Sequence, residues 1–517
     1  MKISKSWRRR SAQQAAAENP NSVKALDNFP QGDITASLDE TLAFIRSMMA
    51  LSSDLVAKET VVRIQGEGRT VRIAVIYIDG LADKQLVHQF IMQPMAEREL
   101  AQASIGCLEQ FLVASNIRRE RSKAKLAQAL LYSSTLVFLD GADEGLTVST
   151  EGWEHRFVGE PVTEPIIRGP QDAFNEVLRS NTALVRRRIK DPALAVEALQ
   201  IGTRSLTDVA VIYLQDVAHP PLVREVIRRL QGIEVDSVMD GGQIEEYLED
   251  NPFSPFPQIA YSERVDKIVA AVLEGKVAVI LDGSPYALSM PATFTSFLFS
   301  PEDYYGKFMG ATFIRWFRAI ALVMALFLPS MYIALITYHQ EMLPTTLMLS
   351  SAANRTGIPF PSFVEALLME ISIELLREAS LRLPGSMGQT IGIVGALVIG
   401  QAAVEAGIVG PILTIIVSFT AIGSFVIPSY NTSIAIRMLR FPMMLLAASL
   451  GIFGIIFGGA AILIHLISLT PFGVGYMEPF RPSRWDHIDD SLFLRKPSYA
   501  MRFRQRYLGL QQLRRRK

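Results

Sequence analysis

The sequence predicts an α/β cytoplasmic region of two related subdomains, followed by an α-helical polytopic membrane domain. Three observations predict this division. Lys is frequent up to Lys307 and then absent until Lys496, although the 517-residue chain carries no net formal charge. Two segments of the first half recur in the same order. The second half contains uncharged stretches of about twenty residues, the length that crosses a hydrocarbon layer of about 30 Å.

The first segment, residues 1–33, is expected to be a disordered basic N-terminal tail. It starts with Lys and Arg residues but has no apolar core of the kind that a secretory signal requires. A single cysteine, Cys107, excludes an internal disulfide framework and a cysteine-based zinc cluster. Both features favour a cytoplasmic location for the residues that follow.

Two α/β subdomains are expected at residues 34–150 and 151–290, where short apolar strands alternate with amphipathic helices. The segment "AVIY" occurs at residues 74–77 and again at 210–213. The segment "AKLAQALLYSSTLVFLDG" (124–141) aligns without gaps on "DKIVAAVLEGKVAVILDG" (266–283). The offsets, 136 and 142 residues, are nearly equal, which argues for related units. A Pro- and Gly-rich stretch at 151–170 is the expected joint.

No catalytic residue, metal site or cofactor is expected. The Asp-Gly pairs that begin at Asp140 and Asp282 favour turns after buried strands over catalytic carboxylates. The six histidines show no ligand spacing, and neither a phosphate-binding loop nor a Ser/His/Asp signature is present. The basic run at residues 186–190 suits an anion, a lipid headgroup or, at least as well, a salt bridge between subunits. The balanced charge gives no indication of nucleic-acid binding.

Residues 291–318 are expected to form an interfacial linker helix. Aromatic rings alternate there with Lys307, Arg315 and Arg318, a mixture that suits headgroup depth, where the cations reach water. Coupling between the cytoplasmic and membrane regions would run through this stretch. Its candidate residues for coupling or gating are Tyr304 and Tyr305, together with Pro329 in the span that follows.

The membrane domain is expected at residues 319–470, with candidate spans at 319–338, 387–408, 411–428 and 441–469. Pro329 predicts a kink in the first span, and the last span is longer than a crossing requires. GxxxG spacings that permit close helix packing occur at Gly388 and Gly392 and at Gly454 and Gly458.

Four full crossings would keep both termini in the cytoplasm, where the basic tail, residues 471–517, belongs by the positive-inside rule. Arg437 and Arg440 conflict with this count. Both favour the cytoplasmic side, and a four-span topology in which the opening helix does not cross places them outside. If the opening helix crosses, these arginines move inside, but the tail moves outside unless another segment crosses or re-enters.

An amphipathic acidic helix is expected at residues 361–383, within this apolar region. At 100° per residue, Glu370, Glu374, Arg377 and Glu378 share one arc. The spacings of Glu374 with Arg377 and of Glu378 with Arg382 allow local ion pairs. Glu370 has no cation at these spacings, and Glu365 projects to the apolar side.

Two interpretations of this helix stay open. Ionisable groups at membrane depth are costly unless they face water or a partner, so the carboxylates are candidates for lining an aqueous pathway. In a ring of several copies each glutamate would itself form a ring, and acidic rings favour cations. Alternatively, the polar stripe faces water or forms salt bridges with another subunit.

From about residue 50 to 482 the sequence resembles the A subunits of bacterial spore germinant receptors, the GerA family. The most specific motifs are "VIYIDGLAD", "EPVTEPIIRGPQDAFNE", "NTALVRRRI", "SPFPQ", "VAVILDGSP", "SPEDYYGKF", "IPSYNTSIAIRMLRFP" and the long run from "PFPSFVEALLMEISIELLREASLRLPGSMGQTIG" to "VEAG". The sequence departs at "SERVDKI", where the family more often has Pro after the Arg.

The resemblance implies a subunit of a nutrient-responsive receptor in the inner membrane of the bacterial spore. Its partners would be a transporter-like B subunit and a lipoprotein C subunit. The resemblance also implies that A subunits form a homo-oligomer that acts as a ligand-gated cation channel. This favours the interpretation in which the acidic helix lines an aqueous pathway. A non-conducting scaffold that docks a transporter, and a transporter itself, remain the alternatives.

Overall fold

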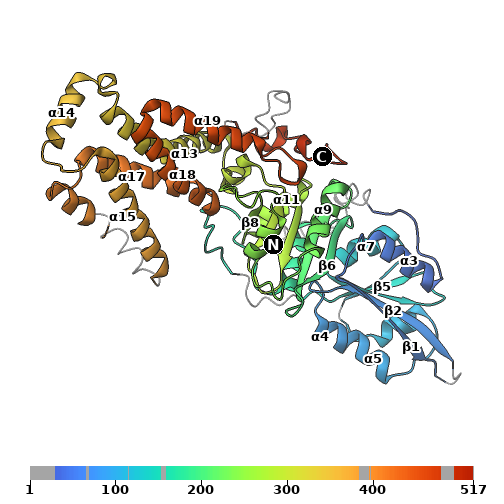
Figure 1. The fold of residues 1–517 in the computed structure, drawn as a ribbon. Helices are drawn as coiled ribbons and strands as arrows, with labels where there is room; N and C mark the ends of the chain where they lie inside the picture. The colour runs from blue at the N-terminus through green and yellow to red at the C-terminus, as the bar shows by residue number, and fades with distance from the viewer. Residues whose placement is uncertain are drawn as a thin grey trace, which may run out of the picture.

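The computed structural model describes residues 29–65, 69–114, 116–152, 159–383, 395, 398–478 and 494–515. It shows an elongated molecule with two α/β units towards one end and a helical region at the other (Figure 1). Residues 1–28 of the predicted basic tail, together with Gly388 and Gly392, lie outside the described residues.

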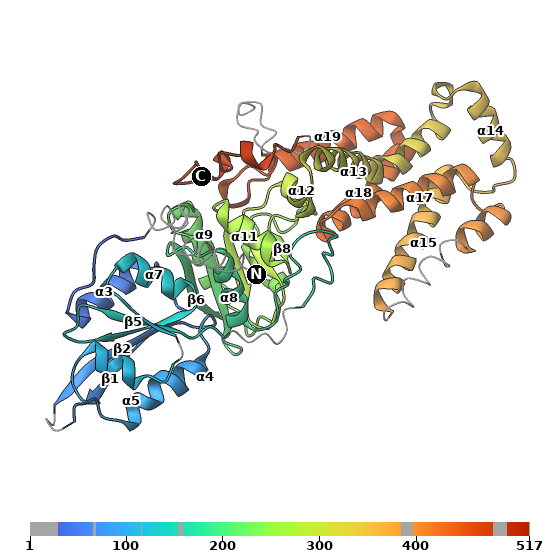
Figure 2. The same ribbon diagram turned by 180° about the vertical axis from the view of Figure 1, so that it is seen from behind.

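The first α/β unit is a five-stranded antiparallel sheet with helices on both faces (Figure 2). Along β2, Ala74, Ile76 and Ile78 pack on one face and Ile73 and Val75 on the other, because successive side chains of a strand point to opposite faces. The strands are β1 (Leu55–Arg63), β2 (Thr70–Ile78), β3 (Ile117–Glu120), β4 (Ser134–Leu139) and β5 (Gly145–Ser149). The helices are α3 (Leu38–Met48), α4 (Lys84–Val87), α5 (Gln93–Glu97), α6 (Ile105–Phe111) and α7 (Lys123–Leu131).

The second unit repeats this architecture. Its strand order, β6-β7-β9-β10-β8, corresponds place for place to β1-β2-β4-β5-β3 of the first unit. The strands are β6 (Leu194–Ile201), β7 (Thr207–Leu214), β8 (Ala260–Ser262), β9 (Val277–Leu281) and β10 (Ala287–Met290). The helices are α8 (Leu178–Arg188), α9 (Pro220–Gln231), α10 (Gly241–Leu248) and α11 (Val265–Leu273). The repeated "AVIY" lies in β2 and β7, and the longer repeat forms α7-β4 and α11-β9.

The two Asp-Gly turns cap a helix in each unit. The Asp140 carboxylate accepts a hydrogen bond from the backbone N–H of Leu38 at 3.3 Å, and Asp282 accepts one from Leu178 at 2.9 Å. These N–H groups begin α3 and α8, where a helix has unsatisfied donors. Gly141 and Gly283 adopt φ of 86° and 85°, the left-handed region that favours glycine. Both aspartates therefore have a structural role in closing their own unit.

A buried ion pair joins the two units. Arg186 of α8 binds Asp54, which precedes β1, and donates to the Ser52 hydroxyl at 2.8 Å. The backbone of residues 51–53 also bonds to Val196 of β6. The basic run at 186–190 thus holds the two units of one chain together through its first arginine.

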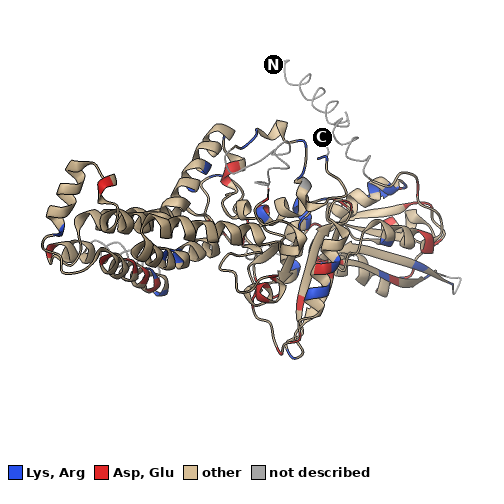
Figure 3. Cartoon of the chain, turned by 45° about the horizontal axis from the view of Figure 1, so that its top comes forward, with Lys and Arg blue, Asp and Glu red and all other residues tan. Residues whose placement is uncertain are grey.

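The helical region is built from helices that alternate in direction. Their bounds are α13 (Phe308–Thr337), α14 (Thr345–Arg355), α15 (Ser362–Arg382), α17 (Pro411–Val426), α18 (Tyr430–Leu450) and α19 (Ile452–Ser468). Helix α13 leaves the α/β units, α17 returns with Gly423 against Ala321, and α18 runs outward again beside α13. Helix α19 comes back, and His465 near its end bonds Ser254 at 2.8 Å. Figure 3 shows how sparse charge is in this region.

Two predictions about the spans are wrong. Residues 441–469 do not form one helix, because the chain reverses at Gly451 (φ 61°) and α19 packs back on α18. The interfacial linker is not a separate helix up to residue 318, because α13 begins at Phe308 and continues without a break to Thr337. A short helix, α12 (Glu302–Tyr305), precedes it.

The end of the chain is packed on the second unit. We call residues 501–515 the C-terminal clasp. Leu508 and Leu510 enter the apolar core formed by α8, α11 and the sheet, and the Gln511 N–H donates to the Val217 carbonyl at 3.1 Å. Arg515 binds Glu274, just after α11.

Candidate functional site

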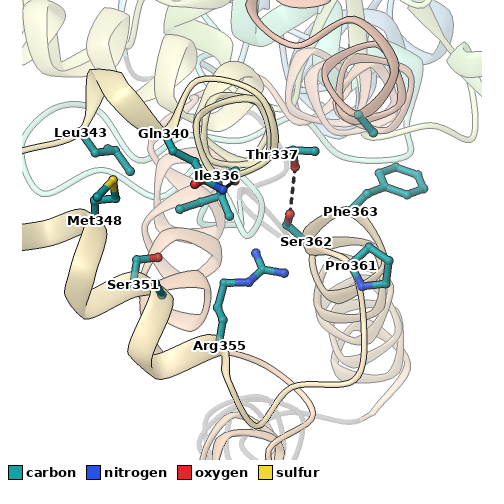
Figure 4. Close-up of a pocket in the computed structure, with 12 residues that line it drawn as sticks. Ile336, Thr337, Gln340, Leu343, Met348, Ser351, Arg355, Pro361, Ser362 and Phe363 are labelled. Carbon is teal, nitrogen blue, oxygen red and sulfur yellow. Dashed lines mark hydrogen bonds between the residues drawn. The ribbon is translucent and has the colours of Figure 1, made fainter. Parts of the chain in front are cut away.

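The acidic helix α15 is tied to its neighbours by three ion pairs. Glu365 binds Arg355 of α14 at 2.9 Å, Glu370 binds Arg440 of α18, and Glu374 binds Arg437 of α18 at 2.5 Å. Figure 4 shows the Arg355 side chain reaching across from α14 towards the start of α15. Glu365 and Glu370 are fully buried, as is Arg440. The side of α15 that carries Glu365, Glu370 and Glu374 therefore faces inward, while the exposed apolar residues of the helix include Leu368, Ile371, Leu375 and Leu381.

Only one of the two predicted local pairs forms. Arg382 binds Glu378 at 2.6 Å on the exposed end of the helix. Arg377 instead donates to the Ser424 hydroxyl at 2.8 Å and lies 4.4 Å from the centre of the Phe425 ring, both on α17. Its expected partner, Glu374, instead pairs with Arg437 of α18, which packs beside α15 in the interior of the helical region.

Pro329 and Arg440 act on the same backbone group. A proline has no N–H, so the carbonyl of Ala325, four residues earlier in α13, lacks its usual helical donor. The Nε of Arg440 donates to this carbonyl at 2.9 Å. Arg440 thus joins α13, α15 and α18 at one point, with Glu370 as its counter-ion.

These pairs remove the conflict over Arg437 and Arg440. Both arginines are neutralised by glutamates within the helical region, so they are not loop cations that report the cytoplasmic side. Buried pairs of this kind contribute little net stability, but losing one partner strands the other charge and typically costs about 3–5 kcal/mol.

A pocket of about 510 Å³ lies at the outer end of the helical region, beside this network (Figure 4). Its walls come from the end of α13, from α14 and from the start of α15, where the Thr337 and Ser362 hydroxyls bond at 3.1 Å. Arg355 lines the pocket while it holds Glu365, whose other oxygen accepts from the Gly410 N–H at 3.3 Å.

The linker carries a second buried cluster of charge. Asp303 of α12 binds Arg315 at 3.0 Å and Arg318 at 2.8 Å, both on α13. The prediction that these two cations reach water is wrong, because they are buried against Asp303. The exposed rings at the start of α13 are those of Phe308, Phe313, Trp316 and Phe317.

The two tyrosines of α12 connect the linker to other parts of the chain. The Tyr305 hydroxyl donates to Asp266 of α11 at 2.5 Å, and the combination of burial and this carboxylate raises the pKa of Tyr305. The Tyr304 carbonyl accepts from Arg495 at 3.2 Å. The linker is therefore in contact with the second α/β unit and with the C-terminal segment.

Two of the predicted packing glycines lie in the α18–α19 hairpin. A Cβ at Gly454 would sit 2.0 Å from the Leu446 carbonyl oxygen, and one at Gly458 would sit 2.5 Å from the Met443 sulfur. Both glycines permit the close approach of the two helices.

Comparison with known proteins identifies the family. The model of the Bacillus/Clostridium GerA spore germination protein family matches residues 43–507. This chain belongs to the GerA family. The predicted family is confirmed.

Several relatives match the chain along most of its length. Spore germination protein KA of Bacillus subtilis (strain 168) is 42% identical, over 90% of this chain and 86% of the relative. Spore germination protein GerLA of Bacillus cereus is 37% identical, over 92% and 96%. The uncharacterized membrane protein YfkQ of Bacillus subtilis (strain 168) is 40% identical, over 93% of each.

A solved structure is also similar to part of this GerA protein. The N-terminal domain of the A subunit of the Bacillus megaterium spore germinant receptor GerK3 is 28% identical, covers 51% of this chain and 98% of its own, and gives a TM-score of 0.41. Within the described helices of this GerA chain, α13 and α18 are long and apolar enough to cross a membrane, and α17 and α19 are shorter apolar helices.

Three arginines of the network, Arg355, Arg437 and Arg440, were not among the predicted site residues. A signal for them was present, because each stands in a Lys-free apolar region where an isolated cation is costly. The choice of carboxylate partner for each arginine depends on helix packing that sequence spacing does not encode. Within the described part of this GerA chain, no cluster of three or more His, Cys, Asp or Glu side chains could hold a metal ion.

Proposed function

We propose that this protein is the membrane subunit of a nutrient germinant receptor that triggers germination, and that several copies assemble into a ligand-gated cation channel. The observation that carries the proposal is the ion-pair network between α15 and α18. It supports a closed state in which Glu370 and Glu374 are neutralised by Arg440 and Arg437.

Opening would separate α15 from α18 and expose the carboxylates to water. Glu374 and Glu378 are the residues best placed to select cations, because their side chains are already 26% and 59% exposed to solvent. Glu370, fully buried, would hold the closed state. Pro329 would act with it, through the carbonyl that Arg440 binds.

We further propose the inner spore membrane as the location, with both termini in the cytoplasm. Helix α13 leaves the α/β units and α19 returns to them, which supports an even number of crossings. The partners would be a transporter-like B subunit and a lipoprotein C subunit. Tyr304 and Tyr305 would transmit a signal between the α/β units and α13.

The proposal is tested by conductance of the purified protein in planar bilayers. Glu374→Gln and Glu378→Gln are expected to lower the preference for cations. Glu405→Gln neutralises an exposed carboxylate of the same region outside α15 and should leave it unchanged. Current whose selectivity ignores both α15 changes would refute the carboxylate-lined pathway.

A non-conducting scaffold is the second candidate. It is favoured by the pairing of Glu365 and Glu370 with arginines of the same chain. Absence of current when the partner subunits are present, with a germination response that survives Glu374→Gln, would support it. Saturable uptake of a solute would instead support a transporter.

A further inference from the structure

A pocket of about 660 Å³ lies where three parts of the chain meet. Helix α11 and the residues after it form one wall, the segment from β10 to α12 forms another, and the C-terminal clasp forms the third. The pocket is separate from the network around α15, and its lining includes the coupling residues Tyr304 and Tyr305.

Lys276, the residue just before β9, lines this pocket without a hydrogen bond or ion pair from its side chain. Its side chain is 7% exposed, and its ammonium makes no hydrogen bond or ion pair with any described residue. An unpaired charge in such surroundings is unfavourable. Burial accordingly lowers the pKa of Lys276 to about 8.

The acids of the pocket are already bound within the protein. Arg515 holds one carboxylate oxygen of Glu274, whose other oxygen has no hydrogen-bond partner, and this carboxylate attracts Lys276 only at longer range. Asp266 is held by Arg264 and Tyr305, and Asp216 by Gln512. Asp191 accepts from the Ala193 N–H, and Glu478 has contacts of its own. None of them forms an ion pair with Lys276.

The other cations of the pocket are engaged as well. Lys267 binds Glu164 at 2.5 Å, Arg515 binds Glu274, and Arg504 donates to the carbonyls of Leu273 and of clasp residues. Among the described lining residues, Lys276 is therefore the cation that is left for a ligand.

Aromatic rings supply much of the remaining wall. Phe299 comes from the linker segment, Tyr304 and Tyr305 from α12, and Phe503 and Tyr507 from the clasp. Rings on opposite sides of a cavity favour a flat apolar body between them.

We propose that this pocket binds a small organic anion, whose carboxylate or phosphate pairs with Lys276 and whose flat apolar body packs against the aromatic walls. The bound anion contacts α11, α12 and the clasp together, so it fixes the clasp and the linker to the second α/β unit. The site is independent of conduction, and its occupancy is measured without any current.

The test uses the full-length protein in detergent micelles, with benzoate as the probe and inorganic phosphate as the charge without an apolar body. Benzoate is expected to raise the melting temperature in a saturable manner, by about 2–4 °C. Lys276→Met should abolish this rise. Because it removes an unpaired buried charge, it should also melt higher than the unmodified protein when no anion is present. Lys58→Met, exposed on β1, is the matched control and should respond to benzoate as the unmodified protein does.

Each other outcome bears on the proposal. Equal benzoate responses in the unmodified protein and Lys276→Met, or no response in either, would overturn it. A response to phosphate but not to benzoate would refute the apolar part of the ligand. A saturable response that appears only in micelles doped with anionic phospholipid would identify the anion as a lipid headgroup rather than a free solute.

Discussion

At the scale of single residues, Lys276 shows how much a buried charge depends on its surroundings. An unfolded chain holds this proton up to a pKa near 10.5, whereas the folded protein releases it at about 8. Between these values the unfolded state binds more protons, so stability rises with pH. The loss of stability that the buried charge of Lys276 causes is therefore complete below pH 8 and absent above pH 10.5.

We therefore expect the melting temperature of the unmodified protein to rise relative to that of Lys276→Met as the pH increases from 7.5 to 9.5. Thermal unfolding of both proteins across this range measures the difference. Parallel pH curves for the two proteins would show that Lys276 is not responsible for a desolvation penalty.

Glu370 and Arg440 differ from Lys276, because each of these two buried charges is neutralised by the other. Glu370→Gln alone is expected to destabilise the protein by about 3–5 kcal/mol, since Arg440 is left buried without a counter-ion. The double change Glu370→Gln with Arg440→Gln should cost less than the sum of the single changes. Unfolding of all four proteins gives the coupling free energy, and additive costs would contradict a direct pair.

At the scale of elements, the α18–α19 hairpin depends on two glycines and not on a third beside them. Gly454→Ala places a methyl group 2.0 Å from a backbone carbonyl, which cannot move aside cheaply, so we expect a loss of at least about 1–3 kcal/mol. Gly459→Ala is the matched control, since its nearest neighbour is the Phe327 ring at 3.4 Å. Equal melting temperatures for the two variants would show that the close approach is not needed.

The elements also show what the sequence could predict. The repeats at 74–77 and 124–141 identified matching strands and helices because burial on both faces imposes the same apolar pattern on both units. The reversal at Gly451 was missed, because apolar residues continue on both sides of it and hydropathy carries no information on direction. The charged stripe of α15 was located by helical period, but its inward orientation depends on Arg437 and Arg440, some sixty to seventy residues away.

At the scale of the whole molecule, the two α/β units are held as one body by the Asp54–Arg186 pair. Asp54→Asn is expected to cost about 3–5 kcal/mol, because Arg186 is fully buried. Asp172→Asn, which removes the partner of the more exposed Arg188, is the matched control and should cost no more than about 1 kcal/mol. Thermal unfolding of the two variants checks this difference, and similar costs would mean that the buried pair does not join the units.

The C-terminal clasp affects the order in which the second α/β unit can fold during synthesis. The core of the second α/β unit contains Leu508 and Leu510, which leave the ribosome after helices α13 to α19 have been synthesised. Gly275 provides the space for Leu510, since a Cβ there would lie 2.3 Å from its methyl carbon. Until the last residues arrive, this unit presents an uncovered apolar surface. A chain that ends before Leu508 would keep that surface exposed to solvent.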